Sequence, residues 1–219
     1  PGTHNLPIYS ALRDRKDIRV IGVLHEVNAA VMADTYGRLV GEPGICLTTS
    51  GPGATNALTG IAQAYTAASP LLHISSTVPI GSPAESLHSV DKSGFLSDLY
   101  SNVTKWSVIL SQGQDIPPTV SRGYHLSKSG RKGPVHISIP SNILWAECPN
   151  PSPPEETLKP VKIDEAVLKS FCSLIQEASR PVIYLGKNIL RHFCTDEAQE
   201  IAEIIEAPVI VPIFYIDVF

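Results

Sequence analysis

The chain has 219 residues, of which 43% are hydrophobic and 17% are charged, against a usual charged share of about 25%. Seventeen Lys and Arg residues against 21 Asp and Glu residues give a net charge of −4. This balance argues against a nucleic-acid partner, which normally requires a basic excess, and it predicts no attraction to anionic membranes.

The spacing of the cysteines and the hydropathy of the chain argue against metal-binding, membrane-spanning and secreted proteins. The four cysteines are widely separated along the sequence: Cys46, Cys148, Cys172 and Cys194. They form no metal-type CxxC pair, and we interpret them as reduced, mostly buried thiols of a cytoplasmic protein. The longest apolar stretch, residues 207–216, is interrupted by two prolines and is far shorter than the roughly 20 residues that a membrane span requires. The sequence also opens without the basic and apolar regions of a secretory signal.

Apolar runs alternate with helix-like segments along the first two thirds of the chain. Helices are predicted at 6–12, 25–40, 54–68 and within 113–128, and strands at 20–24, 45–48, 71–75 and 135–139. Gly41 lies directly after the second helix, as a helix C-terminus favours. Strands that alternate with helices predict βαβ units. We therefore expect an α/β fold, a doubly wound, mostly parallel sheet with helices on both faces.

Two regions indicate how the chain is divided. Pro1-Gly2 is turn chemistry directly before a helix, so we expect a strand to precede it outside this sequence. A proline-rich stretch, 147–163, predicts a stiff linker between a first domain, 1–146, and a second, 164–219. The second segment again alternates helix and strand but is short, and we interpret it as the opening of a Rossmann-like α/β domain.

A run of 42 residues, 43–84, contains no Asp, Glu, Lys or Arg. The helix predicted at 54–68 lies inside this run, so none of its faces is charged. A helix of this kind is normally buried all round. The run therefore predicts a partner surface, either another subunit or another domain, with a central helix under loops as the alternative.

Glu26 follows the apolar run VIGVL and opens a helix that is rich in small residues. A carboxylate is favoured at this position by the helix dipole alone, which is the simplest interpretation. The small residues of that helix permit close packing and predict partial burial of Glu26. A buried carboxyl group has a raised pKa and can hold a proton near neutral pH.

Residues 50–56 form a glycine-rich turn between a strand and a helix. The turn lacks the third glycine of GxGxxG, which argues against a nicotinamide oxidoreductase, and it lacks the Lys-Ser/Thr pair of a P-loop. Its backbone amides could face a ligand, but such a turn alone carries little specificity.

Taken together, these segments resemble a known family. The segment from His25 to Arg38, with HE-x-x-A-A-x-M-A-D-x-Y-x-R, and the following TSGPGATN are similar to the pyrimidine-binding domain of thiamine-diphosphate enzymes. The closest likeness is to the branch of acetolactate synthases, pyruvate oxidases and 2-oxoacid decarboxylases. Further matching segments lie at 1–2, 64–65, 69–71, 78–79, 104–106 and 133–137. The resemblance covers nearly the whole chain and implies a nucleotide-binding-like fold for its second domain.

The resemblance implies a mechanism and a set of site residues. The glutamate at the position of Glu26 hydrogen-bonds N1′ of the aminopyrimidine ring, which favours the tautomer that removes the C2 proton of the thiazolium. The cofactor then serves as the electron sink when a 2-oxoacid loses CO₂. Gly2 and Thr3 match the turn near the thiazolium, and Thr3 stands where decarboxylases place a polar catalytic group. Pro52 and Asn56 match the cofactor-binding glycine loop.

Two further residues are carried over from individual branches. His88 lies where pyruvate-type decarboxylases carry a histidine pair, which would make it catalytic, although a lone histidine is more often structural. Arg131 matches an arginine near the FAD site of acetolactate synthases. The turn at 185–188 lacks that group's glycine run, so FAD binding is left open.

The resemblance also implies what the rest of the protein supplies. In this family a second cofactor domain, marked by GDG, binds the diphosphate and Mg²⁺, and the site forms between two subunits. No GDG is present, so we expect a fragment of a longer protein that is inactive alone and that acts as a homodimer or tetramer. The predicted activity is conversion of pyruvate to acetolactate. The alternatives are a benzoylformate- or indolepyruvate-like decarboxylase that releases an aldehyde, and a non-catalytic interaction module.

Overall fold

A computed structural model of the chain describes residues 1–83, 94–146 and 162–212. The chain divides into two compact units, Pro1–Thr157 and Leu158–Phe219. The division lies within the proline-rich stretch 147–163, and the assignment of the two parts as domains remains a prediction.

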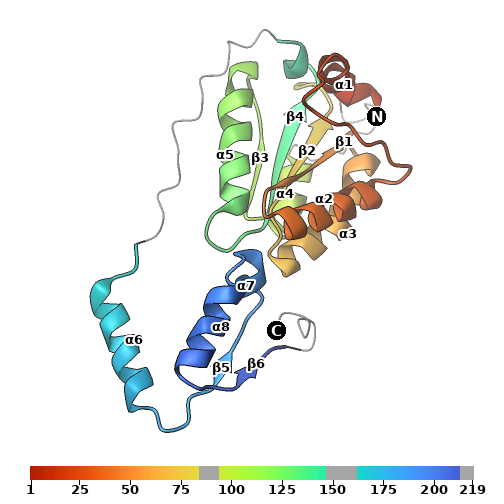
Figure 1. The fold of residues 1–219 in the computed structure, drawn as a ribbon. Coiled ribbons are helices and arrows are strands. Elements are labelled where there is room, and N and C mark those ends of the chain that lie inside the picture. The colour runs from red at the N-terminus through yellow and green to blue at the C-terminus, as the bar shows by residue number, and fades with distance from the viewer. Residues whose placement is uncertain (84–93, 147–161, 213–219) are drawn as a thin grey trace. The chain divides into compact units, whose positions relative to one another are not determined.

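The first unit is built on a four-stranded sheet in which every pair of neighbouring strands is parallel (Figure 1). Its strands are β1 (Gly44–Thr48), β2 (Leu71–Thr77), β3 (Trp106–Ile109) and β4 (Pro134–Pro140). They lie side by side in the order β1-β2-β4-β3. The crossovers between them contain helices, as parallel pairing requires. The predicted α/β class with a parallel sheet is confirmed.

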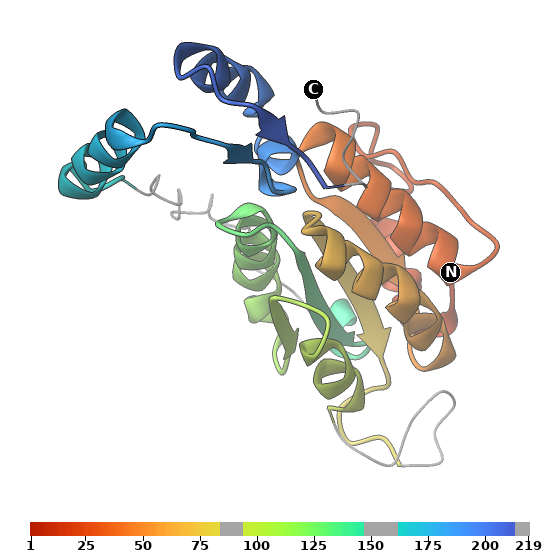
Figure 2. The same cartoon turned by 90° about the horizontal axis from the view of Figure 1, so that it is seen from below.

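Helices cover both faces of this sheet (Figures 1 and 2). Their bounds are α1 (Leu6–Leu12), α2 (Glu26–Val40), α3 (Pro52–Ala67), α4 (Phe95–Ser101) and α5 (Ile116–Lys128). On one face, α2, α3 and α4 pack with Cys46 and Leu71 in a cluster of mostly small residues. On the other face, α5 packs on a more branched cluster that includes Val135 and Ile137. Burial of these two apolar layers is the main driving force for the fold.

Helix α2 approaches the sheet with its backbone. A Cβ atom at Gly37 would lie 2.2 Å from the carbonyl oxygen of Pro70, and one at Gly44 would lie 2.1 Å from that of Ala33. Neither position has room for a side chain. The helix ends at Val40, and the following Gly41 has a φ of 80°, as the sequence predicts.

The run Val20–Leu24 is not a strand, contrary to the sequence-based prediction. Its residues Val20, Ile21 and Leu24 are exposed, and β1 pairs with β2 as its only neighbour among the described strands. An apolar run becomes a strand only when a neighbour takes its backbone hydrogen bonds. Because no described strand does so here, hydrophobicity alone does not produce the element.

Helix α3 carries no charge, yet it is not buried all round within this chain. Seven small or branched residues face the core: Gly53, Ala54, Ala57, Gly60, Ile61, Ala64 and Ala67. Thr59 and Gln63, on the opposite side, are exposed. The exposed outer face does not fit the alternative of a central helix under loops, and coverage of that face by another subunit or domain remains a prediction.

The second unit contains three helices and a short parallel pair of strands among its described residues. They are α6 (Glu165–Glu177), β5 (Ile183–Tyr184), α7 (Asn188–Arg191), α8 (Thr195–Ile204) and β6 (Val209–Ile210). Asp164 caps α6 by accepting a hydrogen bond from the Ala166 amide at 2.8 Å. Among the helices described in either unit, none is both long and apolar enough to cross a membrane.

The cysteines are less buried than the sequence suggests. Cys46 is buried, Cys194 is partly buried and Cys172 is exposed, and all three are free thiols. The expectation of mostly buried thiols is wrong for Cys172, because α6 has no buried residue and so provides no core for this side chain. Cys148 lies outside the described residues.

Candidate functional site

Two helices begin near the carboxyl end of β1 and bring Glu26 and Asn56 together. His25 caps α2, since its Nδ1 accepts a hydrogen bond from the Val27 amide at 3.3 Å, and Glu26 is therefore the first helical residue. Asn56 lies in the first turns of α3. Its Nδ2 donates to Glu26 Oε2 at 3.0 Å. This bond fixes one oxygen of a half-buried carboxyl group.

The glycine-rich turn after β1 packs closely beside the other carboxyl oxygen. Gly51 has a φ of 53°, in the left-handed region that favours glycine. A Cβ atom at Gly53 would lie 2.6 Å from Thr49 Cγ2 and 3.5 Å from Glu26 Oε1. Gly53 therefore lets the turn approach both Thr49 and the Glu26 carboxyl group.

Gly2 is placed against the same turn. A Cβ atom at Gly2 would lie 2.5 Å from Thr49 Oγ1, so Thr49 lies between the two glycines at positions 2 and 53. The Gly2 amide donates to Asn5 Oδ1 at 2.9 Å, and His4 Nδ1 is 2.9 Å from Ser50 Oγ. The N-terminal turn and the glycine-rich turn thus form one continuous structure.

The remaining predicted residues of this region are less constrained. Thr3 belongs to a short 3₁₀ turn, Thr3–Asn5, and is exposed. Pro52 is the first residue of α3 and is also exposed. Both lie in the turns that carry Gly2 and Gly53, and their roles remain predictions. His88 lies outside the described residues.

Arg131 does not join this group. Its Nη2 donates to the Tyr65 carbonyl at 2.7 Å, and its guanidinium lies 5.1 Å from the centre of the Tyr65 ring. Tyr65 is near the end of α3, roughly 14 Å along the helix axis from Asn56. The structure therefore separates the two residues: Arg131 contacts the C-terminal end of α3, and Glu26 is bonded to its N-terminal end.

The charge of Glu26 acts on the core beneath it. Burial, and secondly the charge of Glu26, raise the pKa of the Cys46 thiol to about 12. Cys46 is therefore a neutral packing residue at physiological pH and supplies no nucleophile. On α1, burial raises the pKa of Tyr9, and the thiolate form of Cys46 is a smaller cause of the same shift.

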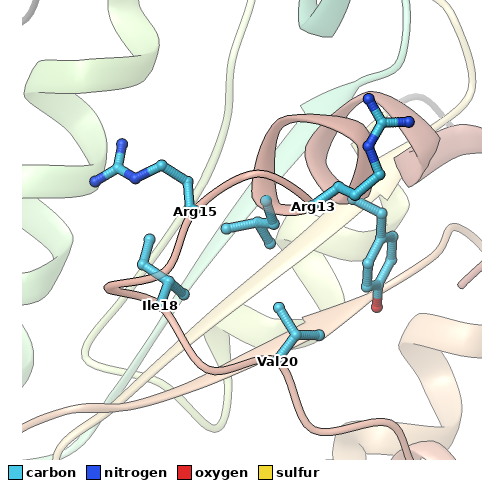
Figure 3. Close-up of a pocket in the computed structure, with 6 residues that line it drawn as sticks. Arg13, Arg15, Ile18 and Val20 are labelled. Atoms are coloured by element: carbon cyan, nitrogen blue, oxygen red, sulfur yellow. The ribbon is translucent and has the colours of Figure 1, made fainter.

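A pocket of about 310 Å³ has none of these predicted residues in its lining (Figure 3). It is lined by Tyr9, Leu12, Arg13, Arg15, Ile18 and Val20. The side chains of Arg13 and Arg15 point away from each other (Figure 3), and each pairs with an exposed neighbour, Asp14 or Asp17. Because its charged groups do not converge on a common point, the pocket offers no arrangement for catalysis.

Sequence reasoning overlooked two residues beside Gly2. Thr49 Oγ1 and Asn5 Nδ2 are buried and have no hydrogen-bond partner among the described residues. Buried polar atoms normally have one, so these two are available to the polar atoms of a ligand or water. Their place inside the motifs PGTHN and TSGPGATN was the available signal. Across the described part of the chain, no cluster of three or more His, Cys, Asp or Glu residues suits a metal ion.

Comparison with known proteins adds independent evidence. Residues 1–98 match the family described as thiamine pyrophosphate enzyme, N-terminal TPP binding domain. An acetolactate synthase of Mycobacterium bovis is 34% identical over 96% of this chain and 34% of its own length. A probable acetolactate synthase large subunit of Methanocaldococcus jannaschii is 35% identical over 95% of this chain and 36% of its own length.

The similarity to acetolactate synthases extends to a yeast protein. The mitochondrial acetolactate synthase catalytic subunit of Saccharomyces cerevisiae is 32% identical over 88% of this chain and 29% of its own length. The chain spans about a third of the length of the curated relatives it matches. The matched domain contains Glu26, Asn56 and both glycine turns. Residues 1–98 therefore match the N-terminal domain of the thiamine pyrophosphate enzymes, and most of the chain is similar to the acetolactate synthases of that group.

Proposed function

We propose that this chain supplies the glutamate half of a thiamine diphosphate site in an enzyme that converts pyruvate to acetolactate. The observation that carries the proposal is the geometry around Glu26. Asn56 holds Oε2 at 3.0 Å, and Oε1 accepts no hydrogen bond from the described residues. A carboxyl group with one fixed oxygen and one unpartnered oxygen suits a ring nitrogen that must gain and lose hydrogen-bonding character.

The residues of the two turns fit this cofactor in size and polarity. Gly2 and Gly53 both lie against the Thr49 side chain, and that residue carries a buried hydroxyl without a partner among the described residues. When bound, thiamine diphosphate supplies the nucleophilic carbon and the electron sink for 2-oxoacid chemistry. Glu26 holds or releases a proton at Oε1, which is general acid–base work for a partly buried carboxyl group. Gly2, Thr3 and Pro52 would border the ring system.

The other cofactors are proposed from the resemblance alone. Mg²⁺ would be held with the diphosphate by a domain that this sequence does not contain. FAD remains open, because Arg131, the one residue proposed for it, stacks on Tyr65 and no second residue supports it.

An assembly of two or four copies is part of the proposal. Several apolar side chains on α2 are exposed in the single chain: Val31, Met32, Tyr36, Leu39 and Val40. A helix that exposes this much apolar surface gains free energy when a second copy covers it. Two copies would also allow the glutamate half of one site to meet a diphosphate half from the partner. We propose a cytoplasmic location on the wide spacing of the cysteines, of which the three in the described residues are free thiols.

Two other functions are retained. A simple decarboxylase, acting on an aromatic 2-oxoacid such as benzoylformate or indolepyruvate, would use the same Glu26 and would give Thr3 or His88 a catalytic role. A non-catalytic interaction module of the same fold would have no need for the Glu26–Asn56 pair, and that pair favours an enzyme.

Product identification with the full gene product tests these alternatives. The protein is supplied with thiamine diphosphate, Mg²⁺ and pyruvate, and the products are identified by mass spectrometry. Acetolactate is the expected product. Acetaldehyde, or turnover only with an aromatic 2-oxoacid, would replace the synthase by a decarboxylase. A lack of cofactor-dependent turnover with every 2-oxoacid would overturn the catalytic proposal.

A further inference from the structure

A cluster of three buried rings lies beneath the start of α3. Tyr100, from α4, is fully buried, as are His73 on β2 and His136 on β4. The ring centre of Tyr100 is 4.2 Å from that of His136 and 4.7 Å from that of His73, and the two histidine rings are 5.0 Å apart. Packing at these distances leaves the three rings little freedom to tilt.

The strands hold the two histidines in place. His73 Nε2 is 2.9 Å from Thr48 Oγ1, at the end of β1. His136 Nε2 is 2.8 Å from Ser75 Oγ, and its Nδ1 is 2.8 Å from Ser107 Oγ. These bonds tie the ring cluster to all four strands of the sheet. Both nitrogens of His136 are bonded, which fixes the orientation of that ring, whereas His73 is held through Nε2 and its buried Nδ1 has no partner among the described residues.

The Tyr100 hydroxyl connects this cluster to the candidate site. It donates a hydrogen bond of 2.5 Å to the carbonyl oxygen of Ala54. Ala54 belongs to the first turn of α3, directly after Gly53 and two residues before Asn56. The same turn therefore accepts one hydrogen bond, from Tyr100 at the Ala54 carbonyl, and donates another, from Asn56 to Glu26 Oε2.

We propose that Tyr100 is a positioning residue of the cofactor site, held by His73 and His136, that fixes the first turn of α3 and, through Asn56, the carboxyl group of Glu26. This inference rests on the proposed function, because it gives the Glu26 orientation a catalytic purpose. Tyr100 itself touches neither Glu26 nor a reacting group. Its effect is transmitted through the Ala54 carbonyl.

The test compares Tyr100→Phe with Tyr124→Phe in the full-length protein. Tyr124 is a matched control. It lies on α5, on the other face of the sheet, and its hydroxyl donates a hydrogen bond of 2.7 Å to Glu42 Oε2. The measurements are thermal unfolding, the dissociation constant of thiamine diphosphate with Mg²⁺ present, and kcat and KM for pyruvate. Both variants lose one hydroxyl, and so both report the structural effect of that loss.

We expect Tyr100→Phe alone to raise the cofactor dissociation constant about fivefold and to lower kcat about tenfold, with KM for pyruvate unchanged. A structural role alone would lower the unfolding temperature in both variants and leave the cofactor dissociation constant unchanged. In the background of Asn56→Ala, the effect of Tyr100→Phe should shrink, because the link to Glu26 is already removed.

The outcomes separate this inference from the proposed function. If the unmodified protein binds thiamine diphosphate and Tyr100→Phe binds it equally well with unchanged kcat, the positioning role is overturned and the proposed function stands. If the unmodified protein does not bind the cofactor, the proposed function itself fails. If Tyr100→Phe does not fold, Thr48→Val, which removes the bond to His73 without changing side-chain shape, replaces it. Unchanged cofactor binding in that variant would equally overturn the role.

Discussion

Glu26 is the residue around which the candidate site is organised. It opens α2, it is half-buried, and it accepts a hydrogen bond from Asn56, thirty residues further along the chain. Its second oxygen borders a turn in which a glycine takes the place of a side chain. One side chain therefore combines a position fixed by a hydrogen bond with partial burial, two features that suit a general acid–base group.

Replacing Glu26 by Gln separates the chemistry of this group from its shape. Glu26→Gln keeps the size of the side chain and a carbonyl oxygen for Asn56, so we expect an unchanged unfolding temperature. Loss of a general acid–base group lowers kcat by roughly 10²–10⁴-fold. Steady-state kinetics of the full gene product with thiamine diphosphate and Mg²⁺ measure the effect.

Glu42→Gln is the matched control for that variant. Glu42 pairs with Lys128 at 2.6 Å and accepts a hydrogen bond from Tyr124, and the substitution leaves Glu26 and its partners in place. It should reduce stability slightly and leave kcat near that of the unmodified protein. Turnover of Glu26→Gln at the level of this control would exclude Glu26 from the mechanism.

Sequence reasoning at this scale found Glu26 and Asn56 inside motifs, but it overlooked Thr49 and Asn5 inside the same motifs and Tyr100 outside them. Glu26 and Asn56 stand in recognisable segments, and the structure brings them into contact. Tyr100 gave no signal, because its hydrogen bond to Ala54 spans 46 positions of sequence. Arg131 was assigned by its motif alone, and that assignment could not anticipate its contact with Tyr65.

At the scale of elements, the pairing of β2 with β4 places two neutral histidines in the core. Residues 73 and 136 are direct partners in the register of the two strands. Burial lowers the pKa of His73 to about 3, and burial together with His73 holds the pKa of His136 well below its usual range. Both imidazoles are therefore uncharged in the folded protein at neutral pH.

This pairing predicts that stability decreases in mild acid. The unfolded chain takes up a proton at each histidine near pH 6.5, and the folded chain does not, so stability is complete above that pH and falls as the pH decreases. For two histidines the loss between pH 7.5 and pH 5.5 is about 1–3 kcal/mol. Urea unfolding at the two pH values measures it. The carboxyl groups with lowered pKa values, Asp17 and Glu42, act only at lower pH.

An exposed histidine provides the comparison for the acid effect. His25→Gln removes an exposed histidine and should leave the pH dependence unchanged, whereas His136→Gln should remove about half of it. A free energy of unfolding that stays constant from pH 7.5 to pH 5.5 would contradict the assignment of two buried neutral histidines.

The elements themselves were predictable where the sequence carries its own boundaries. Residues 6–12 and the helix that ends before Gly41 are found as expected, because turn and capping residues mark them. The strand predicted at 20–24 is absent, since pairing depends on a neighbour that periodicity does not reveal. Strand β3 was overlooked, because its four residues are only partly buried or exposed and give no clear apolar run.

At the scale of the whole molecule, the outer face of α2 predicts self-association. Leu39 is 74% exposed, and the neighbouring apolar residues of α2 extend this surface. Leu39→Asp places a charge where a second copy is proposed to pack, so we expect it to shift the protein to smaller species at micromolar concentration. Light scattering coupled to size-exclusion chromatography gives the mass directly.

A substitution away from α2 provides the comparison. Gln114→Asp adds the same charge at an exposed position and should leave the mass unchanged. An unmodified protein that elutes as a monomer at high concentration would exclude the proposed assembly, whatever the behaviour of Leu39→Asp.

The close approach of α2 to the sheet has a consequence for how this sequence can change over time. At Gly37 and Gly44 the helix and its neighbours meet backbone to backbone, with no space for a side chain. At these two points the distance between α2 and the sheet is therefore set by backbone contact and not by side-chain volume. Core residues elsewhere can be exchanged without altering these two contacts. A mutation that adds even a single methyl group at either glycine would push the helix away from the sheet.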